Sequence, residues 1–91
     1  MTITNNQYTL DATVPTQIVS PSVMPQLVVV HNITKSSNHY IYYGGPNVAI
    51  NNAPHIDPGE TLQLRLLPLE TLFAVSDPDG LTIGVMVQKQ G

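Results

Sequence analysis

The three histidines are the first residues to consider for chemistry, because imidazole is a common metal ligand and general base. His31 ends one expected strand and His39 begins the next, so a hairpin between them would bring the two rings near each other. A metal site needs ligands that converge, often with a carboxylate, and the sequence places no such set around them. We therefore interpret His31, His39 and His55 as solvated residues at strand ends, and we expect no metal and no cofactor.

The carboxylates that could support acid–base chemistry occur in turns. Asp57-Pro58-Gly59-Glu60 has Pro where a type II turn presets φ and Gly where that turn needs a positive φ. Asp77-Pro78-Asp79-Gly80 is typical of a tight hairpin turn, and it lacks the third acid and the distal Glu of a calcium loop. Exposed turns offer no desolvation that would shift a carboxyl pKa. Since no activated serine or phosphate-binding glycine loop is present either, we predict that the protein is not an enzyme and has no catalytic residues.

The low charge of the chain is the unusual feature of its composition. Only 10% of its 91 residues are Asp, Glu, Lys or Arg, whereas about 25% is typical of a globular domain. One interpretation is a polar, uncharged surface, and the other is a surface that is largely an interface in an oligomer or a larger assembly. Small size without cysteines favours the second, because a partner that binds only the folded state adds stability.

Net charge and hydropathy exclude two classes of partner. The net charge is −3, and the only cations, Lys35, Arg65 and Lys89, are scattered along the chain. Phosphate binding needs clustered Lys and Arg, so we expect no nucleic-acid partner. No apolar run approaches the roughly 20 residues of a membrane span, and the first residues lack the pattern of a signal peptide. We therefore expect synthesis in a cytoplasm and no membrane partner.

Proline spacing and hydrophobic alternation predict an all-β fold. Eight prolines leave no window for a convincing helix, and the segments between them are rich in β-branched residues. Residues 26–34 have two apolar faces and predict a central core strand, whereas Leu62, Leu64 and Leu66 alternate with polar residues. The pattern is typical of a small antiparallel β-sandwich, jelly-roll-like, or of a small barrel. The predicted strands span residues 8–14, 26–34, 39–43, at most 48–50, 61–66, 71–76 and 81–88.

The N-terminal segment differs from the rest of the chain. It combines a polar leader with closely spaced prolines, which suits an extended arm along the edge of the sheet or across a neighbour. We predict an arm over residues 1–16 and a β-sandwich domain over residues 17–91. The apolar residues of the arm that we expect to contact a partner are Tyr8, Leu10 and Val14.

Three tyrosines form the one aromatic cluster. Tyr40 and Tyr42 share one face of a predicted strand, while Ile41 and Tyr43 share the other. One of these pairs must lie in the core and the other nearer the surface. Tyrosine is favoured at interfaces because it buries a large ring and keeps a hydroxyl. We predict that Tyr40, Tyr42 and Tyr43 contribute to a protein interface, with a half-buried tyrosine on a sheet as the alternative.

Six short segments follow one another in an order that points to a family. They are Gln17 to Pro21, Leu27 to Asn32, Tyr42 to Gly45, Asp57 to Leu62, Leu72 to Ser76 and a closing strand from Leu81 to Val87. This order resembles that of the small β-sandwich head decoration, or cement, proteins of tailed bacteriophages. The likeness covers residues 17–87 and depends on order and spacing, since each motif alone is common. A Leu-rich stretch over residues 62–69 and the polar leader depart from the pattern.

The resemblance implies a non-enzymatic virion protein. Such a protein binds the outside of the head shell and stabilises it, commonly as a homotrimer. The expected partners are the major capsid protein and further copies of the chain, and the expected location is the capsid surface after synthesis in the host cytoplasm. The alternative is a receptor- or carbohydrate-binding β module of a phage tail or fibre, with Asn47, Asn51 and Asn52 beside the tyrosines.

Overall fold

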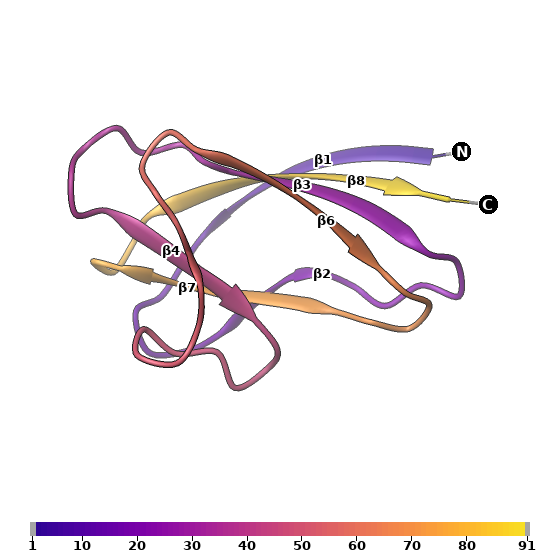
Figure 1. Ribbon diagram of the computed structural model, residues 1–91, viewed down its shortest axis with the longest axis horizontal. Helices are drawn as coiled ribbons and strands as arrows, with labels where there is room; N and C mark the ends of the chain where they lie inside the picture. The colour runs from indigo at the N-terminus through magenta and orange to yellow at the C-terminus, as the bar shows by residue number, and fades with distance from the viewer. Residues whose placement is uncertain (1, 91) are drawn as a thin grey trace.

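The computed structural model describes residues 2–90, which form eight β-strands in two sheets packed face to face (Figure 1). The strands are β1 (Thr2–Thr9), β2 (Thr16–Val19), β3 (Gln26–Asn32), β4 (Tyr40–Gly44), β5 (His55–Ile56), β6 (Thr61–Leu66), β7 (Leu72–Asp77) and β8 (Thr82–Lys89). Sheet A has the strand order β1-β8-β3-β6 and sheet B the order β2-β7-β4-β5, with all pairs antiparallel. The two sheets do not close on each other, so the predicted β-sandwich is confirmed and the barrel alternative is excluded.

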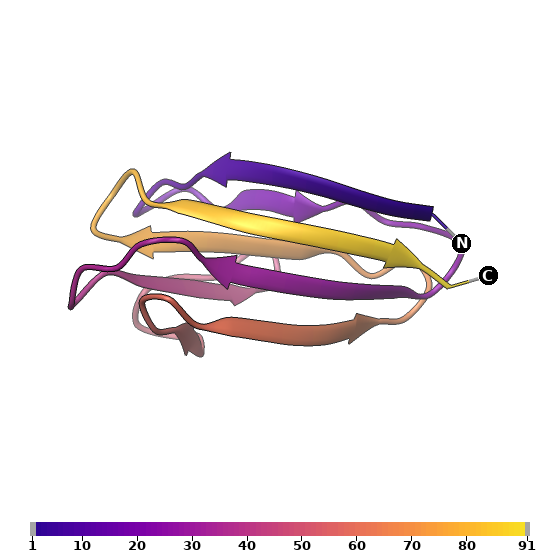
Figure 2. The ribbon, with the colours of Figure 1, turned by 90° about the horizontal axis from the view of Figure 1, so that it is seen from above.

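The connections give the sandwich a jelly-roll-like topology. Each pair of consecutive strands lies in different sheets, except β4 and β5, which are neighbours in sheet B. Figure 2 shows sheet A from above, with β1 outermost, then β8, β3 and β6. In the described part of the chain, no helix is long and apolar enough to cross a membrane.

The core lies between the sheets and follows the period-2 alternation of the strands. Val28 and Val30 of β3 are fully buried, which confirms the predicted central strand, and Ile83 of β8 is buried beside them. Their outward neighbours are only half-buried because sheet B covers one face of sheet A alone. The buried cluster comprises Leu10, Ile18, Val19, Val28, Val30, Ile41, Ile56, Leu66, Leu72, Ala74, Leu81, Ile83 and Val85.

Most predicted strands are confirmed, with ends shifted by one or two residues. The expected alternation of β6 is observed, since Leu66 is buried and Leu62 and Leu64 pack against the core. The possible short strand at residues 48–50 is wrong. Those residues connect two turns, one closed by the bond from the Val48 N–H to the Gly45 carbonyl at 3.0 Å and the next by the bond from the Asn52 N–H to the Ala49 carbonyl at 3.2 Å. The sequence did not indicate β5, which has two residues.

The hairpin predicted at residues 77–80 is also wrong. The turn itself forms, with Gly80 at a φ of 89°, but it connects β7 of sheet B to β8 of sheet A. The Gly80 N–H donates to the Leu10 carbonyl at 2.9 Å, so the turn is fixed against the end of β1 instead of closing a ladder. Turn residues indicate that the chain reverses its direction. Tertiary packing decides which of the two sheets the next strand joins.

Residues 2–9 of the predicted N-terminal arm form an edge strand of sheet A, and the arm then crosses to sheet B, where Thr16 begins β2. Strand β1 pairs with β8 in regular register, from Thr2 opposite Lys89 to Thr9 opposite Thr82. The strand therefore covers the polar leader and ends where the predicted strand at residues 8–14 was expected to begin. A polar segment forms a strand here because its outer side faces solvent. The division of the chain at residues 16 and 17 stays a prediction.

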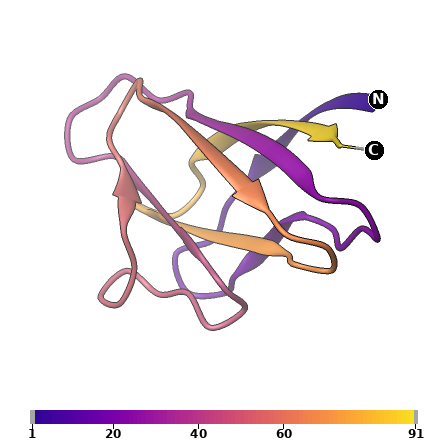
Figure 3. The same ribbon diagram turned by 45° about the vertical axis from the view of Figure 1, so that its right-hand side comes forward.

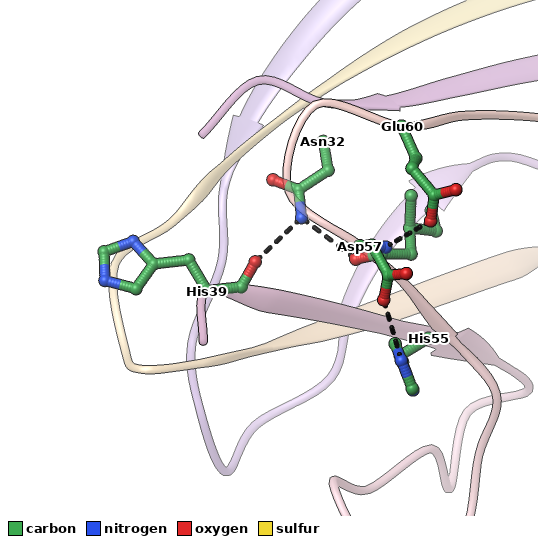
Figure 4. Close-up of polar contacts among 6 residues, drawn as sticks. Asn32, His39, His55, Asp57 and Glu60 are labelled. Carbon is green, nitrogen blue, oxygen red and sulfur yellow. Dashed lines mark hydrogen bonds and ion pairs between the residues drawn. The ribbon is translucent and has the colours of Figure 1, made fainter. Parts of the chain in front are cut away.

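Buried Asn32 joins the two sheets at one corner of the sandwich (Figure 4). Its Nδ2 donates to the carbonyls of His39 and Ile56, at 2.9 and 3.0 Å, and both lie at strands of sheet B. Its Oδ1 accepts hydrogen bonds from the N–H and the hydroxyl of Thr34, at 3.2 and 2.6 Å. All polar atoms of this buried amide are thereby satisfied, which offsets the cost of burying it.

Candidate protein-binding surface

The predicted aromatic cluster exists on the outer face of sheet B. Ile41 is buried, whereas Tyr40 and Tyr42 point outward, as their alternation requires. Both rings contact His55 of β5, with centroid separations of 4.8 and 5.5 Å. The Nε2 atom of His55 lies 2.9 Å from Asp57 Oδ1 (Figure 4). The two tyrosine rings therefore pack against His55 of the same sheet. The role of this cluster in binding stays a prediction.

The other predicted contact residues are placed in different environments. Tyr8 and Tyr43 are half-buried and pack against the core. Leu10 is 2% exposed because the chain turns inward at the end of β1, so it lies in the core and its contact with a partner stays a prediction. Val14 is 62% exposed in the β1–β2 loop, where a partner can reach it.

The histidines do not converge. β3 and β4 lie in different sheets, so the hairpin expected to bring His31 near His39 does not form. His31 Nδ1 instead lies 3.1 Å from the Glu60 carbonyl and 2.9 Å from Thr61 Oγ1, at the start of β6. Within residues 2–90, no group of three or more His, Asp or Glu side chains is placed to hold a metal ion.

A shallow hollow near the tyrosines is the place where the alternative sugar-binding site would lie. It has a volume of about 360 Å³ and is lined by Tyr43, Asn47, Asn52 and neighbouring loop residues. The side chain of Asn52 is already used by the loop. Its Oδ1 accepts from the Ala49 N–H at 2.8 Å, and its Nδ2 donates to the Asn47 carbonyl at 3.2 Å. The amide expected to recognise a ligand therefore holds the loop together.

A larger hollow, of about 640 Å³, lies on the outer face of sheet A. Its lining includes Gly84 of β8, Gln7 of β1, and Val29 and His31 of β3. Its lining residues include no Asp, Glu, Lys or Arg, so it offers no charged group to a small ligand. This uncharged surface is better suited to a protein than to an ionic substrate.

Exposed apolar side chains concentrate at one end of the sandwich, on the β2–β3 and β6–β7 loops. Val23, Met24, Leu67 and Leu69 are 81, 37, 60 and 68% exposed, and we call these four residues the apolar tip. The two loops lie side by side near the end that holds the chain termini (Figure 3), and the Leu69 N–H donates to the Ser22 carbonyl at 2.7 Å. The tip contains four of the six large apolar side chains that are exposed in the described part of the chain.

Local hydrogen bonds hold both loops of the apolar tip. Buried Gln26 donates from Nε2 to the Ser20 carbonyl at 3.0 Å, and the Met24 N–H donates to Ser22 Oγ at 3.2 Å. In the other loop, the Glu70 N–H donates to the Leu67 carbonyl at 3.1 Å, and Glu70 Oε1 accepts from the Leu67 N–H at 2.6 Å. The apolar side chains are therefore presented by ordered turns.

The backbone of Leu69 is strained. Its φ is 68°, in the left-handed region, where a bulky residue costs about 1–2 kcal/mol relative to the right-handed region. Glycine would avoid this cost, yet the position carries an exposed leucine whose side chain is 68% accessible. Backbone strain that stability does not explain is typical of functional positions. The strain at Leu69 therefore marks the apolar tip as the candidate binding surface.

Sequence reasoning misses the apolar tip. Residues 62–69 contain one run of leucines. Because the first of them alternate as in a strand with one buried face, the sequence does not show where the buried strand ends and the exposed loop begins. A signal was present, because Leu67 and Leu69 flank Pro68, where a solvated turn usually has polar residues. Two apolar residues beside a turn proline are therefore the sequence signal that could have indicated this surface.

Comparison with known proteins supports the fold. No protein-family model matches the chain, and no curated protein matches it. Among solved structures, the chain is similar to a chain from the disulfide-linked pili of Bacillus endospore appendages, with a TM-score of 0.60 and 11% identity over 99% of this chain and 87% of that chain. It also aligns with PliG, a periplasmic inhibitor of g-type lysozyme from Aeromonas hydrophila, with a TM-score of 0.44 and 16% identity over 98% of this chain and 85% of that chain. At 11% identity, the pilin likeness shows a shared β-sandwich fold alone.

Proposed function

We propose that this protein is a non-enzymatic structural subunit that attaches to a larger protein assembly through the apolar tip. The observation that supports the proposal is Leu69, an exposed apolar side chain held at a strained φ of 68°. The sequence resemblance favours a bacteriophage head as the assembly, with the protein decorating the outside of the shell and bound to the major capsid protein. In that role it stabilises the shell by bridging neighbouring capsid subunits.

The chemistry of the apolar tip determines what kind of contact it makes. Its four side chains carry no charge, and the adjacent carboxylate of Glu70 is bound to the Leu67 N–H. Exposed ion pairs contribute only about 0–1 kcal/mol each, so little affinity is lost by omitting them. Complete burial of one leucine contributes about 1.5–3 kcal/mol. Repeated over the copies of an oligomer, such contacts give a high avidity.

The test is attachment of purified variants to bare capsid shells. We expect Leu67→Ser to weaken attachment by about 10- to 100-fold, which corresponds to the loss of one buried leucine. Val14→Ser is the comparison variant, because Val14 is equally exposed and lies in the N-terminal segment predicted from the sequence to bind. Weaker attachment of Val14→Ser with unchanged attachment of Leu67→Ser would reject the apolar tip and favour that segment.

Salt dependence tests the apolar nature of the contact. Between 50 mM and 1 M NaCl the Debye length falls from above about 10 Å to about 3 Å, which screens ion pairs and leaves buried apolar surface unaffected. We expect most of the bound protein to stay on the shells across this range. Release of most of it at 1 M NaCl would contradict an apolar contact.

The receptor- or carbohydrate-binding module stays the alternative prediction. The hollow beside Tyr43 does not favour it, because the Asn52 amide is hydrogen-bonded within the loop. Saturable sugar binding that is lost in Tyr43→Ala, together with no attachment to shells, would support this alternative instead.

A further inference from the structure

Strand β1 is an edge strand that lacks the usual protection against pairing. The other three edges are short or interrupted: β5 has two residues, β2 has four with a register shift between Gln17 and Val19, and β6 carries Arg65 and ends before Pro68. β1 has eight residues in unbroken register, without a charge or a proline. Long, regular and uncharged edges are the ones that accept another strand.

The free side of β1 presents a defined set of backbone groups. The Leu10 N–H donates to the Leu81 carbonyl at 2.8 Å, and hydrogen-bonded residues alternate along an antiparallel pair. The backbone groups of the even-numbered residues of β1 therefore face β8. Those of Ile3, Asn5, Gln7 and Thr9 point away from the sheet. These four residues supply the donors and acceptors for an added strand.

We propose that β1 pairs with β1 of a second copy of this chain, antiparallel and about a two-fold axis at Asn6. This register places Asn5 opposite Gln7 of the second copy and Ile3 opposite its Thr9. All four residues with outward backbone groups then lie within the new ladder. Centring the axis on Asn5 would give Thr9 no partner among the residues of β1, so within β1 the Asn6 register is the more complete one.

The side chains of β1 are compatible with self-pairing. A two-fold axis brings identical residues together, so any charge in the strand would face a like charge, and β1 has none. The amides of Asn5 and Gln7 can each donate and accept, so they form mutual hydrogen bonds on the outer face. Because the contact is isologous, it closes at two copies and does not propagate into a fibre.

Pairing would join the two copies of sheet A into one continuous sheet with the β1 strands at its centre. This inference concerns the free protein and does not depend on the assembly to which it attaches. It also replaces the trimer implied by the sequence resemblance with a dimer. One dimer would then present two copies of each binding surface, and thereby increase avidity.

Cysteine cross-linking tests the register, because the chain has no cysteine of its own. In the proposed dimer the two Asn6 residues form a non-hydrogen-bonded pair with a Cα separation of about 4.5 Å, within the range of about 4.4–6.8 Å for a disulfide. We expect Asn6→Cys to form a disulfide-linked dimer under mild oxidation. Thr4→Cys, in the same strand, and Gln63→Cys, on the β6 edge, are the matched controls and should not cross-link.

Proline substitution tests the ladder independently. Asn5→Pro removes an outward N–H while leaving the bonds to β8, whereas Gln63→Pro does the same at the opposite edge of sheet A. In sedimentation equilibrium we expect a dimer for the natural sequence and for Gln63→Pro, and at least a tenfold higher dissociation constant for Asn5→Pro. A monomer or trimer of the natural sequence would overturn the proposal, as would equal cross-linking of Asn6→Cys and Thr4→Cys. A monomer whose β1 edge pairs with a strand of a different protein would also overturn the proposal, and would show that this other protein is the partner of β1.

Discussion

The two turns that flank β6 have the same hydrogen bonds but a different residue at the position with positive φ. In the turn before β6, the Glu60 N–H donates to the Asp57 carbonyl at 3.0 Å, and Glu60 Oε1 accepts from the Asp57 N–H at 3.1 Å. The turn after β6 repeats both bonds between Glu70 and Leu67, at 3.1 and 2.6 Å. Both turns have proline second and a residue with positive φ third. That third residue is Gly59, with a φ of 77°, in the first turn and a leucine, with a φ of 68°, in the second.

The two turns also differ in how they are held and in what they expose. Gly59 adopts its φ without cost. The backbone of Asn32 fixes the first turn, because its carbonyl accepts from the Gly59 N–H and its N–H donates to the Glu60 carbonyl, each at 3.0 Å. The second turn has one backbone bond to a neighbouring loop, from Leu69 to Ser22, and it bears two exposed leucines. The first turn follows every rule of turn chemistry. The second breaks one of them, as functional sites do.

Removing the side-chain amide of Asn32, which joins the two sheets beside the first turn, should have the largest effect. Asn32→Ala would leave the carbonyls of His39 and Ile56 without their amide donor, and a buried unpaired group costs about 1–3 kcal/mol. We expect the free energy of unfolding to fall by about 2–4 kcal/mol, measured by urea denaturation. Asn51→Ala, at an exposed position of another loop, should change it by less than about 0.5 kcal/mol. Similar losses in both variants would show that the side-chain bonds of Asn32 between the two sheets add no stability.

Gly59→Leu makes the first turn resemble the second. No atom lies within 4 Å of a Cβ built at Gly59, so the substitution tests backbone conformation without a steric clash. We expect a loss of about 1–2 kcal/mol in the free energy of unfolding. Gly45→Leu is the matched control, because Gly45 is exposed and is not among the residues with positive φ. A loss equal to that of the control would show that the φ at Gly59 imposes no strain.

Leu69→Gly makes the second turn resemble the first, and its effect should be smaller and of opposite sign. Relief of strain raises the free energy of unfolding, while the flexibility of glycine in the unfolded chain lowers it, so we expect a net gain of about 0.5–1 kcal/mol. The same variant should attach less tightly to shells. Leu67→Gly, where φ is not positive, should lose stability instead. A destabilised Leu69→Gly would show that Leu69 packs within the protein.

A third turn, capped by a carboxylate, should give the smallest effect and a pH dependence. Asp11 Oδ1 accepts from the Thr13 N–H at 2.8 Å and the Val14 N–H at 3.1 Å, and these bonds lower the pKa of Asp11 below 3.8. Because the folded-state pKa is lowered, the stabilisation is present above the unfolded pKa and is lost as pH falls through the folded pKa. Urea denaturation between about pH 5 and pH 2 should show a shallower acid loss in Asp11→Asn than in the natural sequence. An unchanged pH profile would exclude Asp11 as a contributor.

Sequence patterns predicted the elements whose signal is local. Leu62, Leu64 and Leu66 were placed correctly because one face of β6 is buried, which imposes strict alternation. Pro58 and Gly59 predicted their turn because each residue matches the φ of its position. β1 was only partly predicted, because an edge strand of Thr, Asn and Gln has no buried alternation over most of its length.

Tertiary contacts determined what the sequence could not show. The positive φ of Leu69 occurs where its N–H bonds to Ser22, a residue far away in the chain, and leucine itself argues against such a conformation. The turn at Asp77–Gly80 gave no information on which sheet β8 would join. The candidate site depended on these non-local features, so the apolar tip and the free edge of β1 emerged only from the structure.

The pairing of β1 with β8 also has a consequence for how the protein folds. Thr2 lies opposite Lys89, so sheet A cannot be completed until nearly the whole described chain has been synthesised. Folds dominated by such distant pairings fold in about milliseconds to seconds, far more slowly than helical bundles. The strands of sheet B, by contrast, are all available once Asp77 has emerged from the ribosome. During this interval the valines of β3 lack β8 as a neighbour, and the rate of chain synthesis sets how long this nascent segment is open to aggregation.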